Sequence, residues 1–128
     1  GAYSVDKYYR LASGRKWFDQ EQLSIDERNQ ISARWSGQYF DFILSHTCPY
    51  SMRPIDLFLS GIDQSTVDNS MEVWLEEMCY NLKYHTRVWG HYHDDRIQEP
   101  NHYMLFRRFF DIEDIYNNTT DLKLKEEK

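Results

Sequence analysis

The hydrophobic positions of this chain fall into runs that predict strands. The run YFDFILS at 39–45 is apolar, aromatic and of strand length. The segment TRVWGHYH at 86–93 predicts a second strand, which stops at Gly90. HYMLFRRFFDI at 102–112 predicts a third strand, paired with the second as a terminal hairpin. The tyrosine-rich segment 2–11 also has strand character.

Helical periodicity occurs at two places. Ser24 and Glu27 bracket the sequence SIDE, the pattern of a capping box, which predicts a helix from there to about Trp35. A longer stripe of apolar residues recurs at spacings of three and four and predicts the strongest helix, capped by Ser65 or Thr66. Its members are Val67, Met71, Trp74, Leu75, Met78 and Leu82.

Strands that alternate with helices predict an α/β fold, with a mixed β-sheet and flanking helices. The chain has 128 residues, which suits one domain with a usable core. We expect residues 1–116 to form that domain and the polar residues 117–128 to be a frayed C-terminal tail.

Composition narrows the functional classes. The hydrophobic fraction of 41% and the aromatic fraction of 16% exclude a disordered chain. Fifteen basic and 21 acidic residues give a net charge of −6 without a basic run, which argues against non-specific nucleic-acid binding. No apolar run approaches the roughly 18 residues of a membrane span. The two cysteines, Cys48 and Cys79, are too few for a disulfide framework, so we expect a reduced, cytoplasmic setting.

Three histidines are candidate metal ligands. His91 and His93 form an H-x-H motif; alternate residues of a strand share a face, so two imidazoles can reach one ion or two adjacent ions. His46 ends the predicted strand 39–45, and strand ends meet at one edge of an α/β sheet. The sequence therefore predicts a metal site from His46, His91 and His93. Each motif alone is more typical of an ordinary strand end than of a metal site.

Other polar residues offer weaker candidates. Cys48 and Arg53 have the spacing C-x4-R, one residue short of a thiol phosphatase loop, which argues against a thiol nucleophile. Arg10 and Arg53 are candidate phosphate contacts, because guanidinium groups suit phosphate oxygens. Asp94 and Asp95 are candidates to orient the imidazoles, with a solvated turn as the alternative.

The order of these motifs resembles a known enzyme family. LSHTCP at 44–49, followed after an amphipathic helix by WGHYH at 89–93, resembles the C-terminal half of calcineurin-like metallophosphoesterases. GAYSVDKYYR, SHTCPYSMRP and DLFLSGIDQSTVDNSMEVWLEEM are similar to a bacterial and phage, Ser/Thr-phosphatase-like branch. The resemblance covers about residues 1–114. It implies the C-terminal half of a four-layer α/β/β/α sandwich.

The resemblance implies a role for each histidine. His46 and His91 correspond to ligands of a second metal, and His93 to a ligand of the first. In the family, two divalent ions (Mn, Fe or Zn) hold a bridging water that attacks the phosphorus of a phosphorylated substrate. The family's D-x-H, G-D and G-N-H motifs do not occur in this chain. The implied site is therefore incomplete, and we expect the chain alone to be inactive.

Three functions remain open. The favoured one is a C-terminal fragment of a metal-dependent phosphatase or phosphodiesterase whose N-terminal half is missing. The second is a catalytically inactive remnant that serves as a binding or interaction module. The third is an unrelated metal-binding α/β domain. Half of a sandwich leaves an apolar face and an unpaired strand edge, so we also predict a homo-oligomer or pairing with the missing half.

Overall fold

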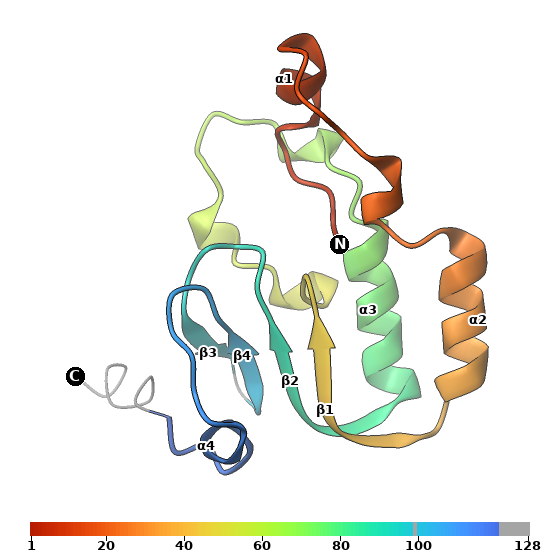
Figure 1. The fold of residues 1–128 in the computed structure, drawn as a ribbon, viewed down its shortest axis with the longest axis vertical. Coiled ribbons are helices and arrows are strands. Elements are labelled where there is room, and N and C mark those ends of the chain that lie inside the picture. The colour runs from red at the N-terminus through yellow and green to blue at the C-terminus, as the bar shows by residue number, and fades with distance from the viewer. Residues whose placement is uncertain (99, 121–128) are drawn as a thin grey trace.

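The fold is a four-stranded mixed sheet with helices on both sides (Figure 1), seen in a computed structural model that describes residues 1–98 and 100–120. The strand order is β1-β2-β4-β3; β1–β2 and β2–β4 are parallel, and β3–β4 is antiparallel. The strands are β1 (Tyr39–Ser45), β2 (Lys83–Trp89), β3 (Arg96–Gln98) and β4 (His102–Met104).

Helices α2 (Ile25–Trp35) and α3 (Ser70–Asn81) lie next to each other, and the short α4 (Ile112–Tyr116) lies across the sheet from them (Figure 1). The predicted capping box of α2 is present: the Glu27 N–H donates to Ser24 Oγ over 3.2 Å, and the Ser24 N–H donates to Glu27 Oε2 over 2.8 Å. These bonds satisfy two amide groups that a helix start otherwise leaves unpaired. The mixed α/β class is therefore confirmed.

The predicted strong helix exists but begins later than expected. Its N-cap is Asn69 rather than Ser65 or Thr66, and the preceding residues Gln64–Thr66 form a separate 3-10 turn. The Asp63 carboxylate accepts the Ser65 N–H over 2.9 Å, which stabilises that turn. Two ends of the apolar stripe, Val67 and Leu82, therefore flank α3 instead of lying in it.

The prediction of a strand at 2–11 is wrong. Residues Lys7–Ala12 form a helix, α1, and Asp6 at its N-cap pairs with Arg10 one turn later, with Nε and Oδ2 2.5 Å apart. This i, i+4 ion pair favours a helix, and no strand in the described part of the chain pairs with this segment. The tyrosine-rich composition is strand-like, but within the described residues the segment has no neighbouring strand to stabilise it.

The predicted hairpin between 86–93 and 102–112 is also wrong. β4 ends at Met104 and runs parallel to β2, while its antiparallel partner is β3, a strand the sequence did not predict. The chain leaves the sheet because the Asp95 carboxylate accepts the backbone N–H groups of Phe106, Arg107 and Arg108, at 2.8, 3.2 and 3.2 Å. Those amides are then not free for a strand ladder.

The core has two parts. One cluster contains Ile97, Tyr103 and Ile115 and packs α4 against the sheet. The other contains Cys48, Trp89 and Met104, all at most 2% exposed. Trp89 is the last residue of β2, so the second cluster supports the chain directly before the candidate metal ligands.

The C-terminal tail predicted for 117–128 lies mostly outside the described residues, which end at 120. Within the described part, Thr120 is 3% exposed. In the ranges 1–98 and 100–120, none of the helices has the length and apolarity needed to cross a bilayer.

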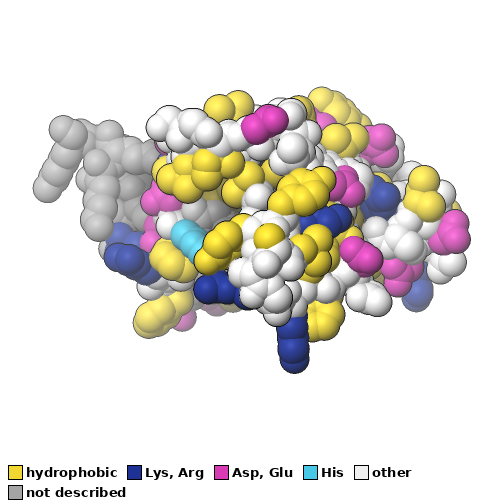
Figure 2. All heavy atoms as spheres, turned by 90° about the horizontal axis from the view of Figure 1, so that it is seen from above, with side chains coloured by type: hydrophobic (Ala, Val, Ile, Leu, Met, Phe, Trp, Pro, Cys, Tyr) yellow, Lys and Arg dark blue, Asp and Glu magenta, His cyan; other side chains and the backbone are white. Residues whose placement is uncertain are grey.

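Strand β1 lies at the edge of the sheet with no buried side chain, although its sequence is that of a core strand. Leu44 is 76% exposed and Tyr39 is 57% exposed. Parallel strands ordinarily have both faces covered, so this exposure is unusual. Figure 2 shows the molecule from above the view of Figure 1. On this face too, apolar side chains reach solvent, with charged groups between them.

We expect the chain to self-associate through β1. Leu44→Lys should weaken that association about tenfold or more, because each copy loses a buried leucine contact. Ile25→Lys is the matched control, since Ile25 is 65% exposed at the start of α2, away from the strand edge. Sedimentation at several concentrations measures the effect, and a wild-type chain that is monomeric throughout contradicts it.

Candidate metal site

His46 and His91 meet at the carboxyl edge of the parallel strands. Ser45 and Trp89, the last residues of β1 and β2, are paired in register. The Gly90 N–H then donates to the His46 carbonyl over 3.1 Å, which extends the pairing past the strand ends. As a result His46 Nε2 lies 2.9 Å from His91 Nδ1, and the ring centroids are 4.8 Å apart. The predicted convergence of the two strand ends is observed.

The spacing of these nitrogens suits one metal ion. Bonds from zinc to imidazole nitrogen are about 2.0–2.1 Å, so two nitrogens at a right angle lie about 2.9 Å apart, and at the tetrahedral angle about 3.4 Å apart. The observed 2.9 Å therefore needs little or no movement to give two ligands. It equally suits a hydrogen bond, in which the two imidazoles share one proton.

Both imidazoles favour the neutral form. Burial, followed by the neighbouring His46 and His93, lowers the pKa of His91 to about 4. Partial desolvation also lowers the pKa of His46 below its usual value. A metal binds the neutral imidazole, so at neutral pH neither ring has to lose a proton from a cationic form before binding.

His93 lies apart from this pair. β2 ends at Trp89, and His91 and His93 both have positive φ, 71° and 59°, so strand alternation does not place them on one face. The His93 ring instead stacks on Phe106, with centroids 4.7 Å apart and planes at 20°. Its role as a metal ligand stays a prediction. Gly90, the residue expected at a sharp turn, has no positive φ; the histidines adopt that conformation.

A buried hydrogen-bonded cluster, the Thr47 cluster, holds the two histidine loops together. It comprises Thr47, Cys48, Glu72 and Tyr92. Thr47 Oγ1 lies 3.0 Å from both Glu72 Oε1 and the Tyr92 hydroxyl, and the Cys48 thiol donates to that hydroxyl over 3.4 Å. The Thr47 proton goes to the carboxylate, so Tyr92 donates to Thr47. Thr47 follows His46 and Tyr92 follows His91, so this bond fixes the separation of the two loops.

We expect Tyr92→Phe to lower metal affinity about tenfold, because groups that orient metal ligands commonly contribute that much. Tyr84→Phe is the matched control: the Tyr84 hydroxyl contacts Cys79 Sγ at 3.5 Å and His102 Nε2 at 3.0 Å, away from the histidine pair. Calorimetric titration with Co²⁺ measures the metal affinity of both variants. Equal losses in the two variants contradict a specific role for Tyr92.

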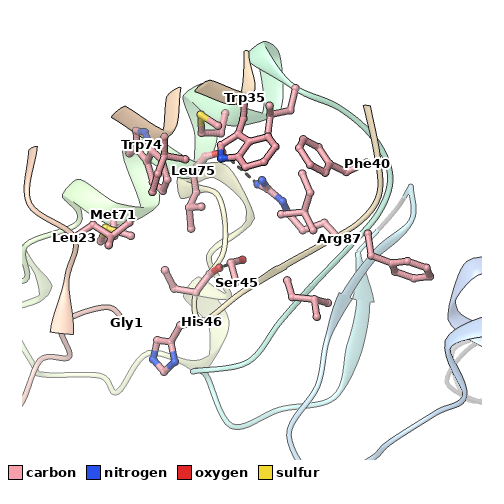
Figure 3. Close-up of a pocket in the computed structure, with 17 residues that line it drawn as sticks. Gly1, Leu23, Trp35, Phe40, Ser45, His46, Met71, Trp74, Leu75 and Arg87 are labelled. Atoms are coloured by element: carbon pink, nitrogen blue, oxygen red, sulfur yellow. Dashed lines mark hydrogen bonds between the residues drawn. The ribbon is translucent and has the colours of Figure 1, made fainter. Parts of the chain in front are cut away.

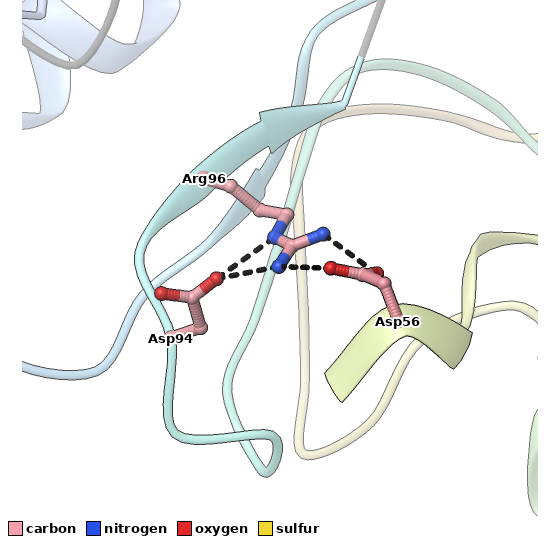
Figure 4. Close-up of polar contacts among 3 residues, drawn as sticks. All are labelled: Asp56, Asp94 and Arg96. Atoms are coloured by element: carbon pink, nitrogen blue, oxygen red, sulfur yellow. Dashed lines mark hydrogen bonds and ion pairs between the residues drawn. The ribbon is translucent and has the colours of Figure 1, made fainter. Parts of the chain in front are cut away.

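The acidic residues after His93 serve the fold. Figure 4 shows the Arg96 guanidinium between two carboxylates: Nη2 lies 2.7 Å from Asp94 Oδ2 and 3.1 Å from Asp56 Oδ2. Asp95 accepts the three backbone N–H groups described above; burial opposes ionisation, but these bonds lower the pKa of its carboxyl overall. The structure thus gives both carboxylates partners other than the imidazoles.

Of the two candidate phosphate contacts, one is near the pair. Arg10 is bound to Asp6 on α1. Arg53 lines a pocket of about 180 Å³ together with His91 and Tyr92. Its guanidinium stacks 3.7 Å above the Tyr50 ring. Cys48 is fully buried, and burial raises the pKa of its thiol to about 11, so it stays protonated.

Comparisons with known proteins leave the family open: no family model, no curated protein and no solved structure matches this chain. Within residues 1–98 and 100–120, no group of three or more His, Cys, Asp or Glu side chains is arranged to hold a metal ion. The candidate site is therefore the histidine pair, with any further ligands supplied by water, by substrate or by another segment.

Proposed function

We propose that His46 and His91 bind one divalent transition-metal ion, and that this chain is the C-terminal part of a metal-dependent phosphoesterase. One observation carries the proposal: two imidazoles at the ends of adjacent parallel strands present nitrogens 2.9 Å apart. The motif order LSHTCP, then WGHYH, supports the phosphoesterase class. When bound, a divalent ion activates water and offsets the charge of a phosphate ester.

The chain's own residues supply binding and orientation. His46 and His91 are the proposed metal ligands, and Thr47 and Tyr92 fix the separation of their loops. Arg53 lines the same pocket as His91, and we assign it to phosphate binding because guanidinium groups suit phosphate oxygens. Two imidazoles do not fill the coordination sphere of such an ion, so hydrolysis requires ligands from outside this pair.

A metal-binding domain without phosphoesterase chemistry is the second candidate, because the histidine pair by itself does not imply a phosphate. Arg53 and His91 line one pocket, which favours the phosphoesterase, since a metal ion held by His91 and a guanidinium would together suit an anionic substrate.

Binding of inorganic phosphate distinguishes these functions. We expect the chain to bind phosphate when saturated with Mn²⁺ and to bind it much more weakly after EDTA treatment. Arg53→Met should weaken phosphate binding about tenfold, through loss of a charged hydrogen bond, and Arg10→Met should leave it unchanged. Metal binding without any phosphate binding would reject the phosphoesterase and leave the metal-binding domain.

A further inference from the structure

Arg87 on β2 is a fully buried cation without an anionic partner. Its residue exposure is 0%, and none of the ion pairs among the described residues includes it. Nη1 donates to the Leu75 carbonyl at 3.3 Å and to Cys79 Sγ at 3.1 Å. The guanidinium carbon lies 5.2 Å from the Tyr84 ring centroid, and Nε has no hydrogen-bond partner within residues 1–98 and 100–120. The partners of this cation are neutral.

The Arg87 side chain lines a cavity of about 430 Å³ beside β1, shown in Figure 3. Helices α2 and α3 contribute apolar walls, which include Trp35, Trp74, Leu75 and Met78. Arg87 is the one Lys, Arg, Asp or Glu side chain among the described residues that line this cavity. Figure 3 shows the guanidinium lying among Trp35, Phe40 and Leu75.

A buried guanidinium with only neutral partners is unfavourable, because desolvation of the charge is not offset by an opposite charge. An anion in the cavity removes that imbalance. A carboxylate suits a single guanidinium best, since its two oxygens match the planar fork and one negative charge cancels one positive charge. The apolar walls then require an apolar group attached to the carboxylate.

We propose that this cavity, the Arg87 cavity, binds an amphipathic monocarboxylate, with the carboxylate on Arg87 and the apolar tail against α2 and α3. His46, a proposed ligand of the metal ion, lines one end of this cavity, but the carboxylate is assigned to Arg87 and does not depend on the phosphoesterase assignment. Charge and wall chemistry together select the ligand class: a neutral alcohol of the same length lacks the charge, and a small hydrophilic acid lacks the tail.

Calorimetry with octanoate and 1-octanol tests the proposal, in EDTA so that bound metal plays no part. The wild-type chain should bind octanoate at least about tenfold more tightly than 1-octanol, because a hydrogen bond to a charged group typically strengthens binding by that factor. Arg87→Met should remove that preference. Arg34→Met is the matched control, because Arg34 stacks on the outside of Trp35, 4.9 Å from its ring centroid, and is exposed; it should keep the preference.

Thermal unfolding gives a second, independent result. Arg87→Met should raise the melting temperature of the ligand-free chain, since it removes an unpaired buried charge but keeps the apolar volume. Octanoate should raise the melting temperature of the wild type and leave that of the variant unchanged. Equal affinity of the wild type for octanoate and 1-octanol, or no binding of either, overturns the proposal, and this comparison decides even if the variant does not fold.

Discussion

His91→Ala is expected to lower the affinity of this chain for Co²⁺ by about 100-fold or more. The substitution removes one of the two nitrogens that lie 2.9 Å apart, and loss of a ligand should exceed the roughly 10–100-fold effect of losing a group that merely orients one. The visible absorption of bound Co²⁺ and calorimetric titration both measure the change.

His85→Ala is the matched control for this experiment. His85 is also on the β2 segment, but its ring stacks on Tyr116 at a centroid distance of 3.8 Å, and its Nδ1 contacts Thr86 Oγ1. The control should bind Co²⁺ like the wild type. If His91→Ala retains wild-type affinity while His85→Ala loses it, the pair at the strand ends is not the site.

Trp89→Ala is expected to lower the free energy of unfolding by about 3–5 kcal/mol, the usual cost of truncating a large buried aromatic side chain. Trp89 is 2% exposed and packs with Cys48 and Met104 at the edge of the sheet that carries the histidines. Urea unfolding measures the difference. Because Trp89 directly precedes Gly90 and His91, metal affinity should fall together with stability.

Tyr80→Ala provides the comparison, since Tyr80 is an aromatic residue of α3 that is 82% exposed. Its effect should stay within about 0.5 kcal/mol. A Trp89→Ala chain that unfolds at the same urea concentration as Tyr80→Ala would show that this cluster is not the main support of the strand ends.

The parts of the fold that the sequence predicted are those with strong local signals. The apolar run of β1 was placed at Tyr39–Ser45, and the Ser24–Glu27 capping box located the start of α2. Both signals arise within a few residues and need no distant partner. Strand β3 has only three residues, Arg96–Gln98, and too little periodicity to be predicted; it exists because β4 pairs with it.

The errors have identifiable tertiary causes. Segment 102–112 reads as one long strand, but Asp95, seven or more residues earlier, binds the amides of 106–108 and ends it. Segment 2–11 is rich in tyrosine, but no strand of the described residues pairs with it, and the Asp6–Arg10 pair favours a helix. The contact of Asp95 with residues 106–108 lies outside the segment and cannot be inferred from its periodicity alone.

The candidate site was predictable in part. Histidines at the ends of two apolar strands pointed to His46 and His91, because parallel strands end at one edge of the sheet. The left-handed backbone of His91 and His93 was not predictable, because residues other than glycine seldom adopt positive φ. This conformation removes the strand alternation that would have placed both rings on one face. Glu72 resembles an ordinary acidic residue of a first helical turn; only the fold shows that it is buried against Thr47.

The most direct test of the metal site is anomalous X-ray diffraction from crystals of the chain grown with Co²⁺, recorded on both sides of the cobalt absorption edge. The account predicts one anomalous peak between His46 Nε2 and His91 Nδ1, about 2.1 Å from each nitrogen. A fully occupied cobalt peak elsewhere, with the two nitrogens still hydrogen-bonded to each other, would contradict it.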